Sequence, residues 1–233
     1  MAGVLRRDLQ AALKRDPAAR NALEVALTYP GVHAIWAYRL NHWLWTHRLK
    51  LAARWGSSLA RLFTGVEIHP GATLGSGIFI DHATGVVVGE TARIGDDVTI
   101  YQGVTLGGTS LEHAKRHPTI GNHVTIGAGA KILGPITVGD DSRIGANAVV
   151  VSSVPANSVV VGIPGRIISR TKPRPAPKDP DIEDGLMPDL IGLSLASLAS
   201  RVDDLESLAG TELDERHVRP PLSGIWSGDD FSI

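Results

Sequence analysis

The sequence predicts an α+β protein in which an α-helical segment precedes a parallel β-helix and an extended C-terminal tail. The main observation is an aliphatic residue that returns at almost every sixth position from Ile68 to Val150. A helix needs an apolar period near 3.6, and a strand needs a period of 2. A period of six instead fits short strands that each turn one aliphatic side chain inward before a corner. Three such strands make a coil of about 18 residues, and parallel ladders stack the coils about 4.8 Å apart.

The period runs in three registers, and small or turn-forming residues often follow the aliphatic ones. The registers are Ile68, Leu74, Ile80 and Val86; Val88, Ile94, Ile100 and Leu106; and Ile120, Ile126, Ile132, Val138, Ile144 and Val150. The third register continues without a break over its whole length, which chance does not explain.

Residues 1–63 lack this period, and we expect them to form an α-helical domain. Asp16 before Pro17 is typical of a helix N-cap followed by proline at the first helical position. Tyr29-Pro30-Gly31 predicts a break. Beyond it, one helical face carries Val32, Trp36, Leu40, Trp43, Leu44 and His47. We expect this aromatic face to pack on neighbouring helices or subunits.

Two interruptions mark the predicted β-helix, which we place at residues 64–170. The register slips by two residues between Val86 and Val88, and a gap of fourteen separates Leu106 from Ile120. About eight extra residues must therefore loop out there, and insertions in a solenoid gather on one face, often the binding face. The flat sides of such a β-helix favour trimers with sites in the grooves between subunits. Residues 171–233 predict a proline-rich linker, a short helix from Leu190 to Leu208, and the tail.

The composition excludes several classes. The chain of 233 residues has 23 Lys and Arg against 24 Asp and Glu, so charge gives no case for binding nucleic acid or an acidic membrane. The lack of cysteine excludes disulfides, thiolate metal sites and a cysteine nucleophile. No apolar run reaches the length of a signal or a membrane span, so we expect a cytoplasmic protein without a membrane anchor. We expect no bound metal.

Histidine is the first candidate for chemistry, since it titrates near neutrality. His82 lies in the string Asp81-His82-Ala83-Thr84-Gly85, which interrupts the plain aliphatic-glycine pattern. Glu67 precedes His82 by fifteen residues, so a coil of about 18 places it near the same corner. A carboxylate beside an imidazole makes the base and orienting group of nucleophile activation. A solvated corner carboxylate is an equal alternative for Glu67.

Two further features are candidates for ligand binding. Arg116-His117 in the looped-out segment offers a forked donor and a second imidazole, which fit a small carboxylate; an exposed loop is the alternative. Ala128, Ala130 and Ala146 leave narrow side chains where a thin ligand could lie against the backbone, or they are corner residues chosen for tight turns.

The sequence closely resembles the serine O-acetyltransferases, a family of hexapeptide-repeat acyltransferases, in its strings DHATG, TLGG, RHP and IGAGAKILG. The resemblance runs from about Asp8 to Arg166. It implies a left-handed β-helix and transfer of acetyl from acetyl-CoA to the L-serine hydroxyl, giving O-acetyl-L-serine and CoA. This reaction is the first step of cysteine biosynthesis, and feedback inhibition by L-cysteine is implied. Acetyl-CoA is then a co-substrate, with no permanently bound cofactor.

The resemblance also implies roles for individual residues. His82 matches the general base, and Glu67 matches its carboxylate partner, where the family usually has aspartate. The serine-binding positions are Asp16, Asp81, His82, Arg116 and His117. The acetyl-CoA positions are Gly107, Gly108, Thr109, Ala128, Ala146, Arg143 and Arg166. Backbone N–H groups near Gly107 and Gly108 are the candidates for stabilising the oxyanion.

The C-terminal residues resemble the family's partner-binding tail. Asp229, Asp230, Phe231, Ser232 and Ile233 carry two acids, an aromatic ring and a terminal isoleucine. The family inserts such a tail into the active site of O-acetylserine sulfhydrylase, and a tail docked on its own trimer is the alternative. The N-terminal helical region looks shorter than in enteric-type members, so we expect a homotrimer and leave the dimer of trimers open.

Three other functions fit parts of the sequence pattern. One is an O-acetyltransferase with a different acceptor, such as a sugar or an antibiotic. A second is a γ-type carbonic anhydrase with His82, His117 and His123 on zinc, although the spacing of six between the last two does not match that family. A third is a non-catalytic partner of the next enzyme, which leaves the predicted dyad unexplained.

Overall fold

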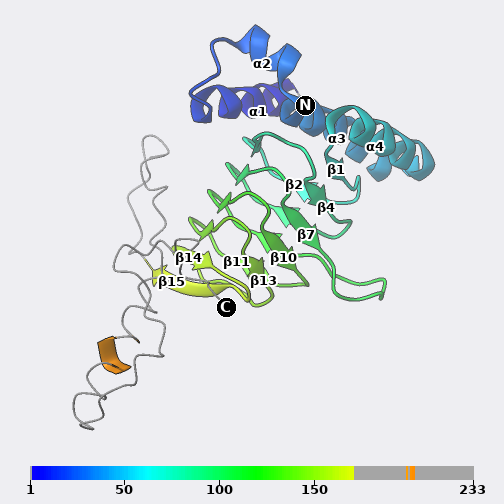
Figure 1. Ribbon diagram of the computed structural model, residues 1–233. Helices are drawn as coiled ribbons and strands as arrows, with labels where there is room; N and C mark the ends of the chain where they lie inside the picture. Colours follow the sequence, from blue (N-terminus) through cyan, green and yellow to red (C-terminus); the bar gives the residue numbers. More distant parts are fainter. Residues whose placement is uncertain (1, 171–197, 199, 203–233) are drawn as a thin grey trace, which may run out of the picture. The chain divides into compact units, whose positions relative to one another are not determined.

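The computed structural model describes residues 2–170, 198 and 200–202, and it confirms the predicted fold class: helices followed by a left-handed parallel β-helix (Figure 1). The helices are α1 (Ala2–Arg15), α2 (Ala22–Thr28), α3 (Pro30–Thr46) and α4 (Lys50–Thr64). Residues 198 and 200–202 are helical and lie within the predicted short helix. The proline-rich linker and the partner-binding residues 229–233 lie outside the described residues.

The expected helix cap at Asp16 needs correction. Asp16 is not an N-cap, because α1 runs up to it and its N–H still donates to the carbonyl of Ala12 at 3.0 Å. Asn21 caps α2 instead, accepting the N–H of Glu24. The break at Tyr29 is confirmed, since Pro30 begins α3.

The residues of α3 that are buried within this chain coincide only in part with the predicted face, whose packing on a neighbouring subunit stays a prediction. The buried residues of α3 are Gly31, Val32, Ala34, Ile35, Tyr38 and Asn41, whereas the side chains of Leu40 and Trp43 are 55% and 43% exposed. The reason is the docking of Tyr38 onto the β-helix: its hydroxyl donates to the Ala72 carbonyl and accepts the Leu74 N–H. The periodicity gave the helix but not which of its faces meets the first coil.

The β-helix consists of short strands in three sheets. The strands are β1 (Glu67–Ile68), β2 (Thr73–Leu74), β3 (Phe79–Ile80), β4 (Val87–Val88), β5 (Arg93–Ile94), β6 (Thr99–Ile100), β7 (Thr105–Gly107), β8 (Thr119–Ile120), β9 (Thr125–Ile126), β10 (Lys131–Leu133), β11 (Thr137–Val138), β12 (Arg143–Ile144), β13 (Val149–Val150), β14 (Ser158–Val161) and β15 (Arg166–Arg170). The first sheet is β1-β4-β7-β10-β13, the second β2-β5-β8-β11, and the third β3-β6-β9-β12-β14-β15. All ladders are parallel except the final pair of β14 with β15.

The register confirms how the interruptions were interpreted. Ile68 pairs with Val88, so this coil has two extra residues, and Leu106 pairs with Ile132, which accommodates the looped-out segment. In Figure 1 that segment projects from the β-helix beyond β7. The aliphatic residues of all three registers are buried and form one continuous core. We call the turn from the first to the second sheet the first corner, the next the second corner, and the turn back to the first sheet the third corner.

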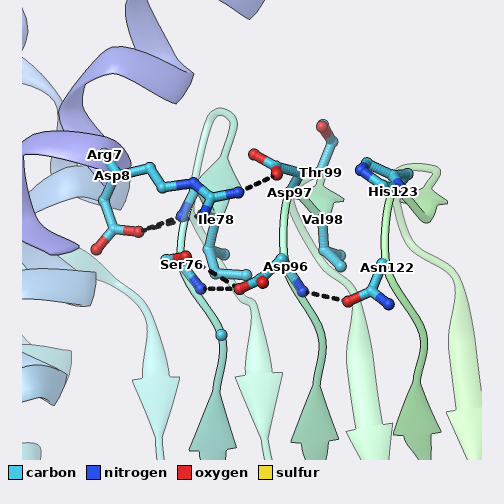
Figure 2. A network of polar contacts seen from close by, with 12 residues as sticks. Arg7, Asp8, Ser76, Ile78, Asp96, Asp97, Val98, Thr99, Asn122 and His123 are labelled. Carbon is cyan, nitrogen blue, oxygen red and sulfur yellow. Dashed lines mark hydrogen bonds and ion pairs between the residues drawn. The ribbon is translucent and has the colours of Figure 1, made fainter. Parts of the chain in front are cut away.

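Side chains along the second corner hold successive coils together and attach α1 (Figure 2). Asp96 accepts the N–H of Ser76 at 2.6 Å, and Asn122 accepts the N–H of Asp96 at 2.9 Å. On α1, the fully buried Asp8 accepts the N–H groups of Gly77 and Ile78 at this corner. These contacts fix α1, and the residues that follow it, on the first coil.

Candidate functional site

The third corner presents the predicted base. Asp81 and His82 directly follow β3, and His82 and Ala83 have φ of 54° and 56°, in the left-handed region. The Asp81 carboxylate accepts the backbone N–H of His82 at 2.9 Å, and its other oxygen lies 3.9 Å from His82 Nε2. The His82 side chain is 73% exposed. The corner therefore holds the imidazole outward, where it can reach a ligand.

Asp16 reaches the same corner from the end of α1. One carboxylate oxygen accepts the Ala18 N–H at 2.8 Å, and the other accepts the Tyr29 hydroxyl at 2.5 Å. Burial, the bond to Asp16 and the nearby charges, Asp81 among them, raise the pKa of Tyr29 to about 12. Burial and then the charges of Asp81 and Asp16 raise the pKa of Tyr101 as well. The Asp16 and Asp81 carboxylates therefore both lie near the hydroxyl groups of Tyr29 and Tyr101.

Asp16 and Asp81 share a second property. Among the residues that the structure describes, neither forms an ion pair with lysine or arginine. Both carboxylates lie near Tyr29 and Tyr101, and a cation bound there would be attracted by both of them. An ammonium group fits this position.

Glu67 has a different neighbour from the one that the spacing suggested. It begins β1, and its carboxylate pairs with Arg61 at the end of α4 at 2.6 Å. Both side chains are exposed to solvent, at 64% for Arg61 and 36% for Glu67, so this pair contributes little to stability. The described contacts of Glu67 do not include His82, and the proposed dyad stays a prediction.

Arg116 and His117 lie at the first corner, where Thr91 holds both of them. The Thr91 hydroxyl accepts the N–H groups of Arg116 and His117, and the Thr91 N–H donates to His117 Nδ1 at 3.2 Å. Because Nδ1 accepts, Nε2 carries the proton of the neutral ring. Arg116 pairs with Glu90 at 2.7 Å. A cleft of about 280 Å³ opens beside Glu90, Thr91 and Arg116.

The ring of His117 depends on a glycine. A Cβ built on Gly89 would lie 2.0 Å from Cδ2 and Nε2 of His117, so only glycine leaves room for the ring there. His117 is buried, and burial followed by the positive charge of Arg116 lowers its pKa. A neutral imidazole with a proton on Nε2 and an arginine beside it can donate to a carboxylate.

The residues matched to acetyl-CoA also divide between two corners. Gly107 ends β7, and Gly108 and Thr109 follow it at the first corner. Gly134 of the next coil packs against Thr109, since a Cβ on this glycine would lie 3.1 Å from Thr109 Oγ1. Ala128 and Ala146 lie at the third corner, two and three coils beyond His82, and the Ala128 carbonyl accepts the Asn147 N–H. Their small side chains leave the backbone accessible. Arg143 begins β12 and Arg166 begins β15, both in the third sheet.

The third corner lies before each strand of the first sheet and the first corner lies after it, so the two corners are at opposite ends of these strands. The chain leaves the third corner through β4 and reaches Gly89, Glu90 and Thr91 only after that strand. A single chain therefore brings Asp16, Asp81 and His82 together, and it brings Arg116 and His117 together, but it keeps these two groups apart. The histidines considered for zinc are separated too, because His123 lies at the second corner.

No cluster of three His, Cys, Asp or Glu side chains is arranged to hold a metal ion in the part of the chain that the structure describes. None of the helices described is long and apolar enough to cross a membrane.

Comparison with known proteins identifies the family. A family model described as bacterial transferase hexapeptide (six repeats) matches residues 117–152. The chain is 57% identical over 233 residues to a serine acetyltransferase of Mycobacterium tuberculosis, with all of both chains covered. The chain belongs to the serine acetyltransferase family. The function and enzyme class expected from the sequence are thereby confirmed: it is an acyltransferase of this family.

Solved structures of the family have the same fold. One is a serine acetyltransferase of Brucella abortus in complex with coenzyme A, with a TM-score of 0.71 and 50% identity over 73% of this chain and 68% of that chain. Another is a serine acetyltransferase in complex with cysteine, with a TM-score of 0.72 and 47% identity over 73% of this chain and 66% of that chain.

The structure adds three residues that the sequence reasoning missed. Thr91 positions Arg116 and His117, Gly89 leaves space for the His117 ring, and Tyr29 holds Asp16. A signal for the first two was available, since the string Gly89-Glu90-Thr91 begins the turn just after the two-residue slip. Tyr29 was noted only as part of a helix break, and nothing in the pattern connected it with Asp16.

Proposed function

We propose that the chain transfers the acetyl group of acetyl-CoA to the hydroxyl of L-serine, giving O-acetyl-L-serine and CoA, the step that commits serine to cysteine biosynthesis. The observation that carries the proposal is the pair of carboxylates, Asp16 and Asp81, which have no basic partner among the described residues and lie at the same corner as the exposed imidazole of His82. An acceptor with an ammonium group close to its hydroxyl would place that hydroxyl next to a base. Serine has this arrangement, and a neutral sugar lacks the ammonium.

In the proposed mechanism His82 is the general base. Its exposed ring takes the proton of the serine hydroxyl, and the oxygen attacks the thioester carbonyl in a ternary complex, so that CoA leaves as the thiol. N–H groups near Gly107 and Gly108 would stabilise the oxyanion. A carboxylate near His82 would orient the ring, and both Asp81, at 3.9 Å, and Glu67 are available for this role. Glu67 would first have to leave Arg61.

A complete serine site needs a second copy of the chain. Asp16 and Asp81 at the third corner would bind the ammonium group of serine. Arg116 and His117 at the first corner would bind its carboxylate. Within one chain, these two corners lie at opposite ends of the strands of the first sheet. In a trimer of β-helices the third corner of one subunit can face the first corner of the next. We therefore propose a homotrimer with three composite sites, and we leave a dimer of trimers open.

The same arrangement would complete the acetyl-CoA site. Ala128 and Ala146 of one subunit and Gly108 and Thr109 of the next would line the two sides of one groove, with Arg143 and Arg166 as the candidates for binding phosphate. The complex of a relative with coenzyme A supports this co-substrate. We also propose a cytoplasmic location, because acetyl-CoA is an intracellular metabolite.

L-Cysteine is the proposed inhibitor. It has the charged groups of serine, so the same four side chains would hold it, and the complex of a relative with cysteine supports this proposal. A second proposed partner is O-acetylserine sulfhydrylase. The carboxylate of Ile233 would bind where that enzyme holds its own substrate's carboxylate, with Asp229, Asp230, Phe231 and Ser232 adding contacts.

The activity test follows thiol release from acetyl-CoA with a panel of acceptors. We expect release with L-serine, and much less with D-serine, with 3-hydroxypropionate, which lacks the amino group, and with a sugar. Release that is fastest with a sugar would contradict the proposed acceptor. Purified His82→Ala protein, which keeps both carboxylates, is the matched control for background hydrolysis.

A further inference from the structure

We propose that Tyr29 is a positioning residue that makes the enzyme select acceptors with an amino group. Its hydroxyl donates to Asp16 and so fixes one wall of the ammonium pocket, without itself touching the reacting atoms. The inference rests on the proposed function, since it concerns the same acceptor pocket.

The backbone around Tyr29 is fixed from both sides. Tyr29 ends α2, its N–H donating to the Val25 carbonyl at 3.2 Å, and it precedes α3, whose His33 N–H donates to its carbonyl at 3.1 Å. Pro30 restricts Tyr29 to extended conformations, and its φ and ψ of −92° and 104° agree with this restriction. The phenol is therefore directed by a rigid joint between two helices.

Asp16 is held in two directions. Tyr29 binds one carboxylate oxygen, and the Ala18 N–H binds the other. The preceding residue, Arg15, is attached to the β-helix through Asp97 at 3.2 Å and the Gly77 carbonyl at 3.0 Å. The carboxylate is thus oriented before any ligand arrives, which lowers the entropy cost of binding.

The group that donates to Asp16 is the neutral Tyr29 hydroxyl, and its lack of charge determines the selectivity for acceptors with an amino group. A lysine or arginine in place of Tyr29 would neutralise Asp16 and compete with the ammonium of the acceptor. A phenol orients the carboxylate and leaves the negative charge of the pocket intact. Its pKa of about 12 keeps the proton on the hydroxyl throughout the working range of an assay. Asp16 and Asp81 together then attract one cation.

The test is the substitution Tyr29→Phe, which removes one oxygen atom. We expect the KM for L-serine to rise about tenfold, the loss typical of a hydrogen bond to a charged group. kcat and the KM for acetyl-CoA should change less than about twofold. The preference for L-serine over 3-hydroxypropionate should shrink by a similar factor, because only L-serine uses the pocket. In an Asp16→Asn background the substitution should have little further effect.

Tyr38→Phe is the matched control. It removes a hydroxyl that holds Ala72 and Leu74 of the first coil, so it should lower the melting temperature and leave the KM for L-serine unchanged. An unchanged KM and an unchanged acceptor preference in Tyr29→Phe, with an active parent enzyme, would overturn the inference. An additive loss in the Asp16→Asn background would also overturn it. If the parent enzyme itself does not acetylate L-serine, the proposed function fails instead.

Discussion

Replacing Gly89 with alanine tests the packing of the carboxylate side of the site. The added Cβ would lie 2.0 Å from Cδ2 and Nε2 of His117, well inside van der Waals contact. The ring has to move, because it is buried and the glycine backbone is part of the coil. Moving the ring breaks the contacts of Nδ1 with the N–H and hydroxyl of Thr91, at 3.2 Å and 2.9 Å.

The expected loss of stability can be estimated from these contacts. Overpacking costs about 1–3 kcal/mol, and each lost hydrogen bond about 1 kcal/mol. Alanine restricts the unfolded chain and returns about 0.4–1 kcal/mol. With two hydrogen bonds lost, the net loss in the free energy of unfolding is therefore about 2–4.5 kcal/mol. Since Nε2 moves away from its place at the first corner, the KM for L-serine should rise by about tenfold or more, the value of a charge-assisted hydrogen bond.

Denaturant unfolding and steady-state kinetics measure these two effects. Gly3→Ala is the control, because a Cβ there meets no atom within 4 Å. The double variant Gly89→Ala, His117→Ala should be no less stable than His117→Ala alone, since the clash is gone. Wild-type stability and KM in Gly89→Ala would refute the reasoning, because the ring would then not depend on the glycine.

Further predictions concern the base, the clamp, stability at high pH and the tail. His82→Ala should reduce kcat roughly 10²–10⁴-fold, and Glu67→Gln should cost less; retained activity in the former contradicts its role as base. Arg116→Ala should raise the KM for L-serine far more than that for acetyl-CoA, and equal effects argue against the clamp. Tyr38 has its pKa raised by burial to about 12, so its contribution is complete below pH 10 and disappears as the pH rises to 12. About 2–3 kcal/mol from Tyr38 is lost in this window, and Tyr38→Phe should remove this part of the loss and leave that of Tyr29, whose pKa is also raised to about 12. Deleting Ile233 should abolish co-elution with the sulfhydrylase and leave acetyl transfer intact; persistent co-elution contradicts the anchor.

The β-helix could be predicted from the sequence because its rule is local and repeated. Each inward aliphatic residue, such as Ile126, meets the same position of the next coil, here Ile144, so a fixed period determines sheet, register and core together. Even the looped-out segment could be located from the break between Leu106 and Ile120. The helices lack such a rule. The face of α3 that packs on the first coil is determined by Tyr38 and its two backbone partners, which the period of the helix does not encode.

The site residues were indicated by motifs, but their grouping needed the structure. Glu67 was expected near His82 from a count of residues, and such a count does not show that Arg61 lies within reach of the longer glutamate side chain. Asp16 was interpreted as a helix cap, whereas its hydrogen bonds run to Ala18 and Tyr29. The separation of His82 from Arg116 follows only from the order of the strands around the coil.

That separation leads to the most direct test of the composite site. At an L-serine concentration far below the KM of Arg116→Ala, both His82→Ala and Arg116→Ala are expected to be nearly inactive, and each leaves one corner intact. When equal amounts are unfolded and refolded together, random trimers should regain about a quarter of wild-type activity, since each site needs an intact third corner from one subunit and an intact first corner from the next. Mixing without unfolding is the control. Activity that stays at the level of the separate variants after joint refolding would contradict a site shared between subunits.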